Sequence, residues 1–285
     1  MNIELDRITH PLRLAKGSHQ PGSGKGCAMN VISYINGDME ITDYPACSAR
    51  PLSKLVQMLN DGLADEDGYL SPKNSVLVLN LGWRTVGTAD VPREVVLRWL
   101  AELLVNPVHG VVQHANPEAV PAIRHVAELL GRQVAGGTVS GAEWIQARTG
   151  AYAVNASAYA SAYASAAANA AASAAASAAV YASAPAYVSA AVYASAAAYA
   201  AADDPKAAIS CAAAAAYAAA NAAVVASANA VGGYANIYAH IYAGPRVEFT
   251  RWAIEKWREL AKLDEPQPIT AVEINNALKQ IGSHA

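Results

Sequence analysis

A long alanine-rich stretch without charged side chains most constrains what this chain can fold into. No Asp, Glu, Lys or Arg occurs between Arg148 and Asp203, and alanine fills most positions, with Ser, Asn, Tyr and Val between them. Alanine loses no side-chain entropy in a helix and heads the helix-propensity scale, whereas it is depleted in strands. The stretch therefore predicts α-helices.

Start and stop signals divide this region into three helices. Ser140 and Glu143 have the spacing of a capping box, in which each side chain bonds the other residue's amide. Pro185 and Pro205 each favour the first turn of a new helix, and Gly232-Gly233 is a double stop. We expect helices over about 140–183, 185–202 and 205–231.

A six-residue repeat over 179–202 offers one alternative, a left-handed β-helix, because its tyrosines recur six residues apart. Such coils need bulky aliphatic side chains inside at every turn, whereas the recurring large residue here is tyrosine. We therefore prefer the helical interpretation.

The alanine-rich helices need neighbours, because isolated alanine helices bury little apolar area. Small side chains let helices approach closely. The sequence is therefore compatible with two alternatives, an intramolecular bundle and self-association between copies. The residues expected to form the interaction surface are Tyr159, Tyr163, Tyr181, Tyr187, Tyr193 and Tyr199. Membrane insertion is disfavoured, because the Leu and Ile of real spans are missing. An ice-binding surface is disfavoured because no threonine occurs between Thr149 and Thr250.

The flanking sequence has ordinary composition and also predicts helices. Apolar stripes bounded by capping and stop residues place them at about 27–35, 48–62, 90–104, 116–131, 246–263 and 270–282. Ser48 is the expected cap of the second. Residues 76–79 suit a buried strand or a helix, and Ser71-Pro72 favours helix. The prediction is an all-α protein with an N-terminal helical domain (1–139), an alanine-rich helical bundle (140–245) and C-terminal amphipathic helices (246–285).

Charge and cysteine content restrict the class of function. The formal net charge of −3 argues against a nucleic-acid-binding protein. Three cysteines give no even disulfide framework, which indicates reduced thiols and a cytoplasmic location. The first 20 residues lack the apolar core of a signal peptide. No motif indicates a cofactor.

One segment, residues 17–61, could carry chemistry at a thiol. Cys27 follows Gly26 at the predicted start of an apolar helix, where the helix N-terminus lowers a thiol pKa. His19, His109, His114 and His125 could serve as the base, with His19 the preferred candidate, so a thiol-dependent hydrolase is the alternative function. Papain-like enzymes similarly place a cysteine at a helix start, although their signature is absent. The favoured interpretation is that Cys27 and Cys47 are buried structural thiols beside the 52–59 stripe.

The same segment, together with the preceding His10, contains side chains that commonly bind metals, namely His10, His19, Cys27, Asp38, Asp43 and Cys47. None shows the paired spacing of a structural zinc site, such as two cysteines three residues apart. We therefore predict no metal site.

A pattern of residues over 15–90 resembles a group of uncharacterised actinobacterial and phage-encoded proteins that also carry an alanine-rich C-terminal half. The pattern comprises Gly17-Ser18-His19, Pro21, Cys27, Met29, Asp43, Pro45, Cys47, Asn60-Asp61, Arg84 and Val86-Gly87-Thr88. Those proteins usually have Glu where this chain has Asn30, and Ser-Pro directly after the second cysteine. The resemblance implies a bacterial or phage origin and a cytoplasmic site, and it brings no activity.

These observations together favour a non-enzymatic accessory protein of a bacterium or phage that binds another protein or itself. A monomer normally covers its solvent face with charge, and this chain has more than fifty consecutive residues without any. We therefore expect a homo-oligomer or a complex with a protein partner, and no nucleic-acid or membrane partner.

Overall fold

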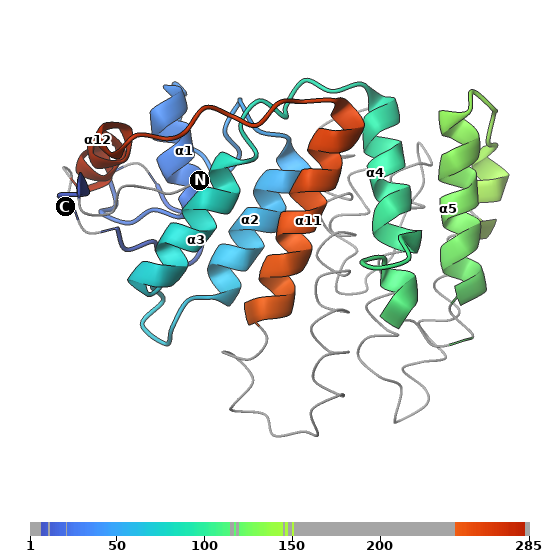
Figure 1. The fold of residues 1–285 in the computed structure, drawn as a ribbon, viewed down its shortest axis with the longest axis horizontal. Helices are drawn as coiled ribbons and strands as arrows, with labels where there is room; N and C mark the ends of the chain where they lie inside the picture. Colours follow the sequence, from blue (N-terminus) through green and yellow to red (C-terminus); the bar gives the residue numbers. More distant parts are fainter. Residues whose placement is uncertain are drawn as a thin grey trace. The chain divides into compact units, whose positions relative to one another are not determined.

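The computed structural model describes residues 7–10, 12–20, 22–114, 117, 120–144, 146–147, 150 and 243–282. Within these ranges the secondary structure is helical, with isolated β-bridges and no strand (Figure 1). This confirms the all-α class for the described part of the chain. The alanine-rich helices expected beyond residue 150, and all six tyrosines expected to form the interaction surface, lie outside the described residues.

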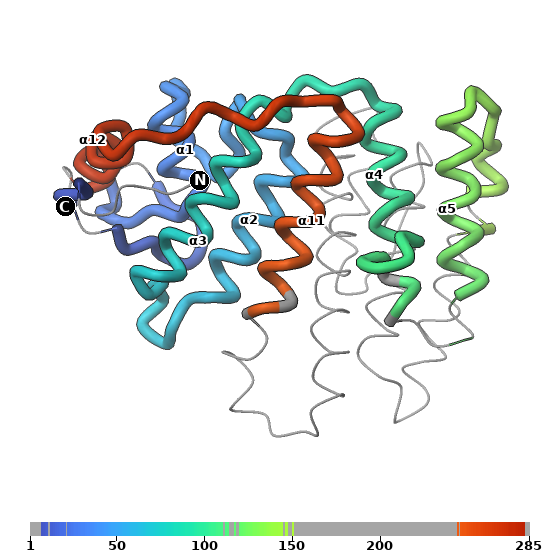
Figure 2. The backbone as a smooth tube through the Cα atoms, viewed as in Figure 1, coloured from blue at the N-terminus to red at the C-terminus, as the bar shows by residue number. Residues whose placement is uncertain are grey.

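The chain divides into two compact units. The first unit combines Met1–Asp90 with Lys262–Ala285, and the second unit is Val91–Ala261. The domain boundaries expected near residues 140 and 246 both fall inside the second unit. Figure 2 follows the path of the chain, in which the C-terminal residues rejoin the unit formed by the N-terminal ones.

In the described residues, four α-helices build the first unit, namely α1 (Ala28–Asn36), α2 (Arg50–Gly62), α3 (Pro72–Trp83) and α12 (Ala271–Gly282). α1 packs against each of the other three. Gly37 ends α1 with a left-handed φ of 73°, as the sequence predicted. Residues 76–79 lie in α3, which settles the ambiguity in favour of a helix. Ser71 caps α3 by accepting the Asn74 amide at 3.2 Å.

The cap of α2 differs from the prediction. Ala49 occupies the N-cap position, and no side chain caps the helix. The Ser48 hydroxyl instead accepts a 2.8 Å hydrogen bond from the Thr85 hydroxyl. Ser48 lies beside Val86 in an isolated antiparallel bridge. This pairing places the Ser48 side chain next to Thr85 and not at the start of α2.

A glycine permits the close packing of α1 on α3. A Cβ atom added to Gly82 would lie 2.7 Å from Ile32 Cδ1 and 3.4 Å from Met29 Sδ. Both of those side chains are fully buried. Any larger residue at position 82 would therefore require the Ile32 side chain to move within a fully buried site.

The C-terminal residues are held to the first unit by polar contacts as well as by packing. Asn275 of α12 accepts from the amides of Thr9 and His10 and donates to the carbonyl of Arg7. The Trp83 indole donates to the Gln267 carbonyl at 2.6 Å. The predicted capping box at Thr270 and Glu273 is present and opens α12.

The second unit contains α4 (Arg93–Val105), the 3-10 helix η2 (Val111–His114), α5 (Val120–Val134) and α11 (Ala243–Ala261). α4 packs against both α5 and α11. The Trp99 ring meets the Trp257 ring edge-on at 5.1 Å, and its indole donates to the Ala253 carbonyl. The predicted capping box at Ser140 and Glu143 is formed. The Ser140 amide, followed by Arg132, lowers the pKa of Glu143 to about 2.

Candidate functional site: a buried thiol and carboxylate

The polar centre of the first unit is the carboxylate of Asp43, in the loop between α1 and α2. Asp43 is only 8% exposed. One of its oxygens accepts from the Asn30 amide at 3.1 Å and from the Cys27 thiol at 3.4 Å. The other accepts from the Gln57 amide at 2.8 Å. Among the described residues Asp43 has no ion-pair partner, so neutral donors alone compensate the buried charge.

Asn30 connects this carboxylate to the start of α1 by using both halves of its side-chain amide. Its oxygen accepts the Cys27 backbone amide at 2.9 Å, and its nitrogen donates to Asp43. A glutamate at this position could accept from the Cys27 amide. It could donate to Asp43 only when protonated. Asparagine therefore supplies both the acceptor for Cys27 and the donor for Asp43.

Two side chains on the inner face of α2 attach the N-terminal segment to the network. Gln57 also donates to the Ser18 hydroxyl at 3.3 Å. Asn60 donates to the Ala15 carbonyl at 2.8 Å and accepts the Ala28 amide at 3.3 Å. Both side chains are almost fully buried. Together they link the 15–18 segment, α1 and α2.

Other residues of the 15–90 pattern form further contacts in the first unit. The Gly87 amide donates to the Cys47 carbonyl at 2.8 Å, and the Thr88 hydroxyl accepts the Ala49 amide at 2.9 Å. The Gly17 amide donates to Asp61 at 2.9 Å. These contacts hold loops and helix starts of the first unit together.

The Cys27 thiol is not set up as a nucleophile. Burial, followed by the negative charge of Asp43, raises its pKa far above the ordinary thiol value. The amides of Asn30 and Met29 lower that pKa, as predicted for a helix start, but burial outweighs them. At neutral pH the group is therefore a thiol that donates to Asp43, and not a thiolate.

The candidate base does not pair with this thiol. Cys27 is 0% exposed, and in the described part of the chain its thiol bonds Asp43 and no histidine. His19 is partly buried, and its Nε2 atom has no hydrogen-bond partner there. The geometry thus lacks the nucleophile–base contact of a thiol hydrolase.

Cys47 departs from the expectation that both cysteines are buried. It is half-buried, and its sulfur lies 3.7 Å from the Ser48 hydroxyl. Burial raises its pKa as well. Cys27 and Cys47 therefore differ in access to solvent.

The residues considered for a metal site take other roles. Asp38 accepts from the Ser33 hydroxyl at 2.7 Å and from the Ala46 amide at 3.3 Å. His10 lies beside α12, where its backbone amide bonds Asn275. Within the described ranges, no group of three or more His, Cys, Asp or Glu side chains could hold a metal ion.

Sequence reasoning identified Cys27 but missed the network around it. It treated the carboxylate of Asp43 only as a possible metal ligand and did not single out Gln57. One signal was available. Ser53, Gln57 and Asn60 follow a helical spacing of four and three residues and fall within the apolar stripe of α2. Polar residues on a buried helix face usually have hydrogen-bond partners.

Comparison with known proteins adds no relative. No family model matches the chain, and neither a curated protein nor a solved structure is significantly similar to it. Among the described helices, none combines the length and apolar character needed to cross a membrane.

Proposed function

We propose that the protein is a non-enzymatic, protein-binding or self-assembling accessory protein of a bacterium or phage. Its interaction surface would be the alanine-rich segment, and its two helical units would serve as the support. The observation that carries the proposal is the length of chain, from Arg148 to Asp203, that contains no charged side chain.

The arrangement of the second unit supports this proposal. The helices before the alanine-rich segment, α4 and α5, and the helix after it, α11, belong to one compact unit. α11 is fixed to α4 by the contact between Trp99 and Trp257 and by the hydrogen bond to the Ala253 carbonyl. The segment is thus tethered at both ends. Anchoring both ends lowers the entropy cost of presenting a binding surface.

The state of Cys27 favours binding over catalysis. The thiol at the start of α1 is protonated, fully buried and bonded to a carboxylate. Three side chains hold Asp43, and each also contacts another part of the unit or defines a helix start. The network is therefore suited to holding the first unit together.

The test introduces charge into the alanine-rich segment. Ala164→Glu and Ala175→Glu lie three helical turns apart, so a helix presents both on one side. The control is the double variant with Gln, which matches Glu in size and helix propensity but adds no charge. Light scattering at micromolar concentration should give an oligomer for the wild type and the Gln variant, and a smaller species for the Glu variant. A wild-type monomer would contradict self-assembly.

Partner binding is tested with the same pair of variants. Each is expressed in the native host and purified by affinity. A specific partner should co-purify with the wild type and the Gln variant and be lost from the Glu variant. Equal recovery with all three would contradict a role for the uncharged surface.

A further inference from the structure

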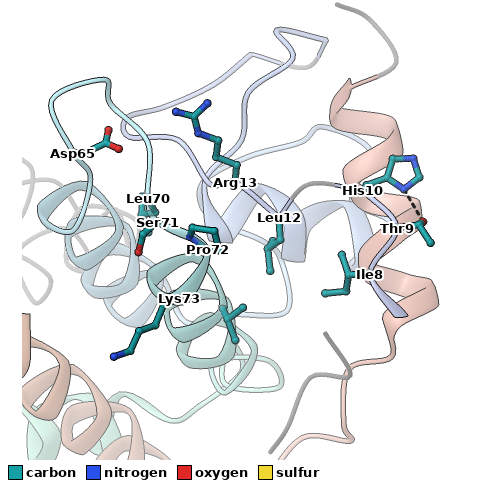
Figure 3. Close-up of a pocket in the computed structure, with 11 residues that line it drawn as sticks. Ile8, Thr9, His10, Leu12, Arg13, Asp65, Leu70, Ser71, Pro72 and Lys73 are labelled. Carbon is teal, nitrogen blue, oxygen red and sulfur yellow. Dashed lines mark hydrogen bonds between the residues drawn. The ribbon is translucent and has the colours of Figure 1, made fainter. Parts of the chain in front are cut away.

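A groove in the first unit lies between the N-terminal segment and the start of α3. Its volume is about 930 Å³. Its apolar lining consists of Ile8, Leu12, Leu70, Pro72 and Val76. Figure 3 shows Ile8 and Leu12 on one side of this space and the first turn of α3 on the other. Part of the apolar lining, including Leu12 and Val76, is incompletely buried.

Two cations border this apolar surface without an ion-pair partner. Arg13 and Lys73 line the groove, and within the described residues neither forms a salt bridge. The Arg13 guanidinium instead lies 4.0 Å above the Tyr69 ring. Other arginines, such as Arg84 and Arg98, are paired with glutamates. Among the described lining residues the one carboxylate is that of Asp65, which accepts the Tyr69 amide.

The placement of the two cations indicates the shape of the occupant. In the view of Figure 3, Pro72 lies between Arg13 and Lys73, and the charged ends of these two side chains point in opposite directions rather than toward one point. Small-molecule sites usually converge a few polar groups on one ligand. Separated cations on either side of an apolar surface instead complement a linear segment that carries acidic residues around an apolar one.

We propose that this groove binds a linear segment of a partner protein in which apolar side chains are flanked by Asp or Glu. The site is distinct from the surface in the proposed function, because the alanine-rich stretch has no acidic residue before Asp203 and cannot supply this charge pattern. The apolar side chains of the segment would contact Leu12 and Val76, and its carboxylates would pair with Arg13 and Lys73.

The experiment uses a random dodecapeptide phage library selected against the full chain at low salt. Enriched peptides are then measured by fluorescence anisotropy. The expected consensus has acidic residues on both sides of a Leu, Ile or Phe. Arg13→Gln and Lys73→Gln should each weaken binding about fivefold, as for exposed ion pairs. Arg13→Lys should retain most of the affinity, and Arg124→Gln, an exposed arginine of α5, should change nothing.

Hydrogen exchange of the complex locates the bound peptide. Slower exchange in residues 8–14 and 68–76 is expected, together with weaker binding as salt rises. The proposal is overturned by any of three results. These are a selection without an acidic consensus, affinities unchanged in the Arg13→Gln and Lys73→Gln double variant, or protection confined to other residues.

Discussion

Replacing Asp43 with alanine should loosen the first unit, because the carboxylate is the shared acceptor of its buried network. The change leaves the Asn30 amide nitrogen and the Cys27 thiol without their acceptor. The Gln57 amide nitrogen retains one acceptor, the Ser18 hydroxyl. An unsatisfied buried polar group costs about 1–3 kcal/mol. Burying a carboxylate costs desolvation free energy in the wild type. The alanine variant avoids that cost, which offsets part of the loss. We expect a net loss of about 2–4 kcal/mol in the stability of this unit.

Hydrogen exchange by mass spectrometry measures this loss in each unit separately. Amides of α1 and α2 that exchange through opening of the unit should exchange roughly 30- to 700-fold faster in the variant. Amides of α5, in the second unit, should be unchanged. Glu40→Ala is the matched control, because Glu40 is an exposed acid three residues before Asp43. It should stay within about 0.5 kcal/mol of the wild type. A rise of less than threefold in α1 for Asp43→Ala would refute the reasoning.

Four further changes have distinct expected outcomes. Because burial raises the pKa of Cys27, the folded chain retains the thiol proton that the unfolded chain releases. Stability in urea should therefore fall as pH rises above about 8.5, and the fall should be smaller in Cys27→Ser. Gly82→Ala puts a Cβ atom 2.7 Å from a side-chain carbon of α1 and should destabilise the first unit by about 1–3 kcal/mol. In Gly131→Ala the added Cβ atom meets open space within α5, so the variant should stabilise the second unit by up to about 1 kcal/mol. The midpoints of urea unfolding measure the effects of both glycine variants. Asn30→Glu brings a second carboxyl to Asp43, so one of the pair must hold a proton, and thermal melts should show stability falling as pH rises above about 4.3.

The helices could be predicted from the sequence because their ends carry local signals. The capping boxes at Ser140 and Thr270 and the stop at Gly37 depend only on residues within one turn. The ambiguous 76–79 segment resolved as a helix because the Ser71-Pro72 start signal is also local. Local physical chemistry thus predicts the positions of these elements well.

The network and the division into units depend on contacts between distant parts of the chain. Asn275 bonds residues more than 260 positions away, and Asp43 receives hydrogen bonds from both α1 and α2. No local pattern specifies such pairings. The predicted cap at Ser48 failed for the same reason, since the Thr85 hydroxyl 37 residues away donates to it. The sequence correctly predicted a helix start at Cys27 but not the burial that dominates the pKa of its thiol.

The rate at which iodoacetamide alkylates each cysteine of the native full-length chain tests most directly whether this protein acts without thiol chemistry. Peptide mass spectrometry at pH 7.5 separates Cys27 from Cys47. Because Cys27 is 0% exposed and bonded to Asp43 while Cys47 is half-buried, Cys27 should react at least about tenfold more slowly. The two rates should become equal in urea. A native Cys27 that reacts faster than Cys47 would contradict the account and restore the thiol-dependent hydrolase.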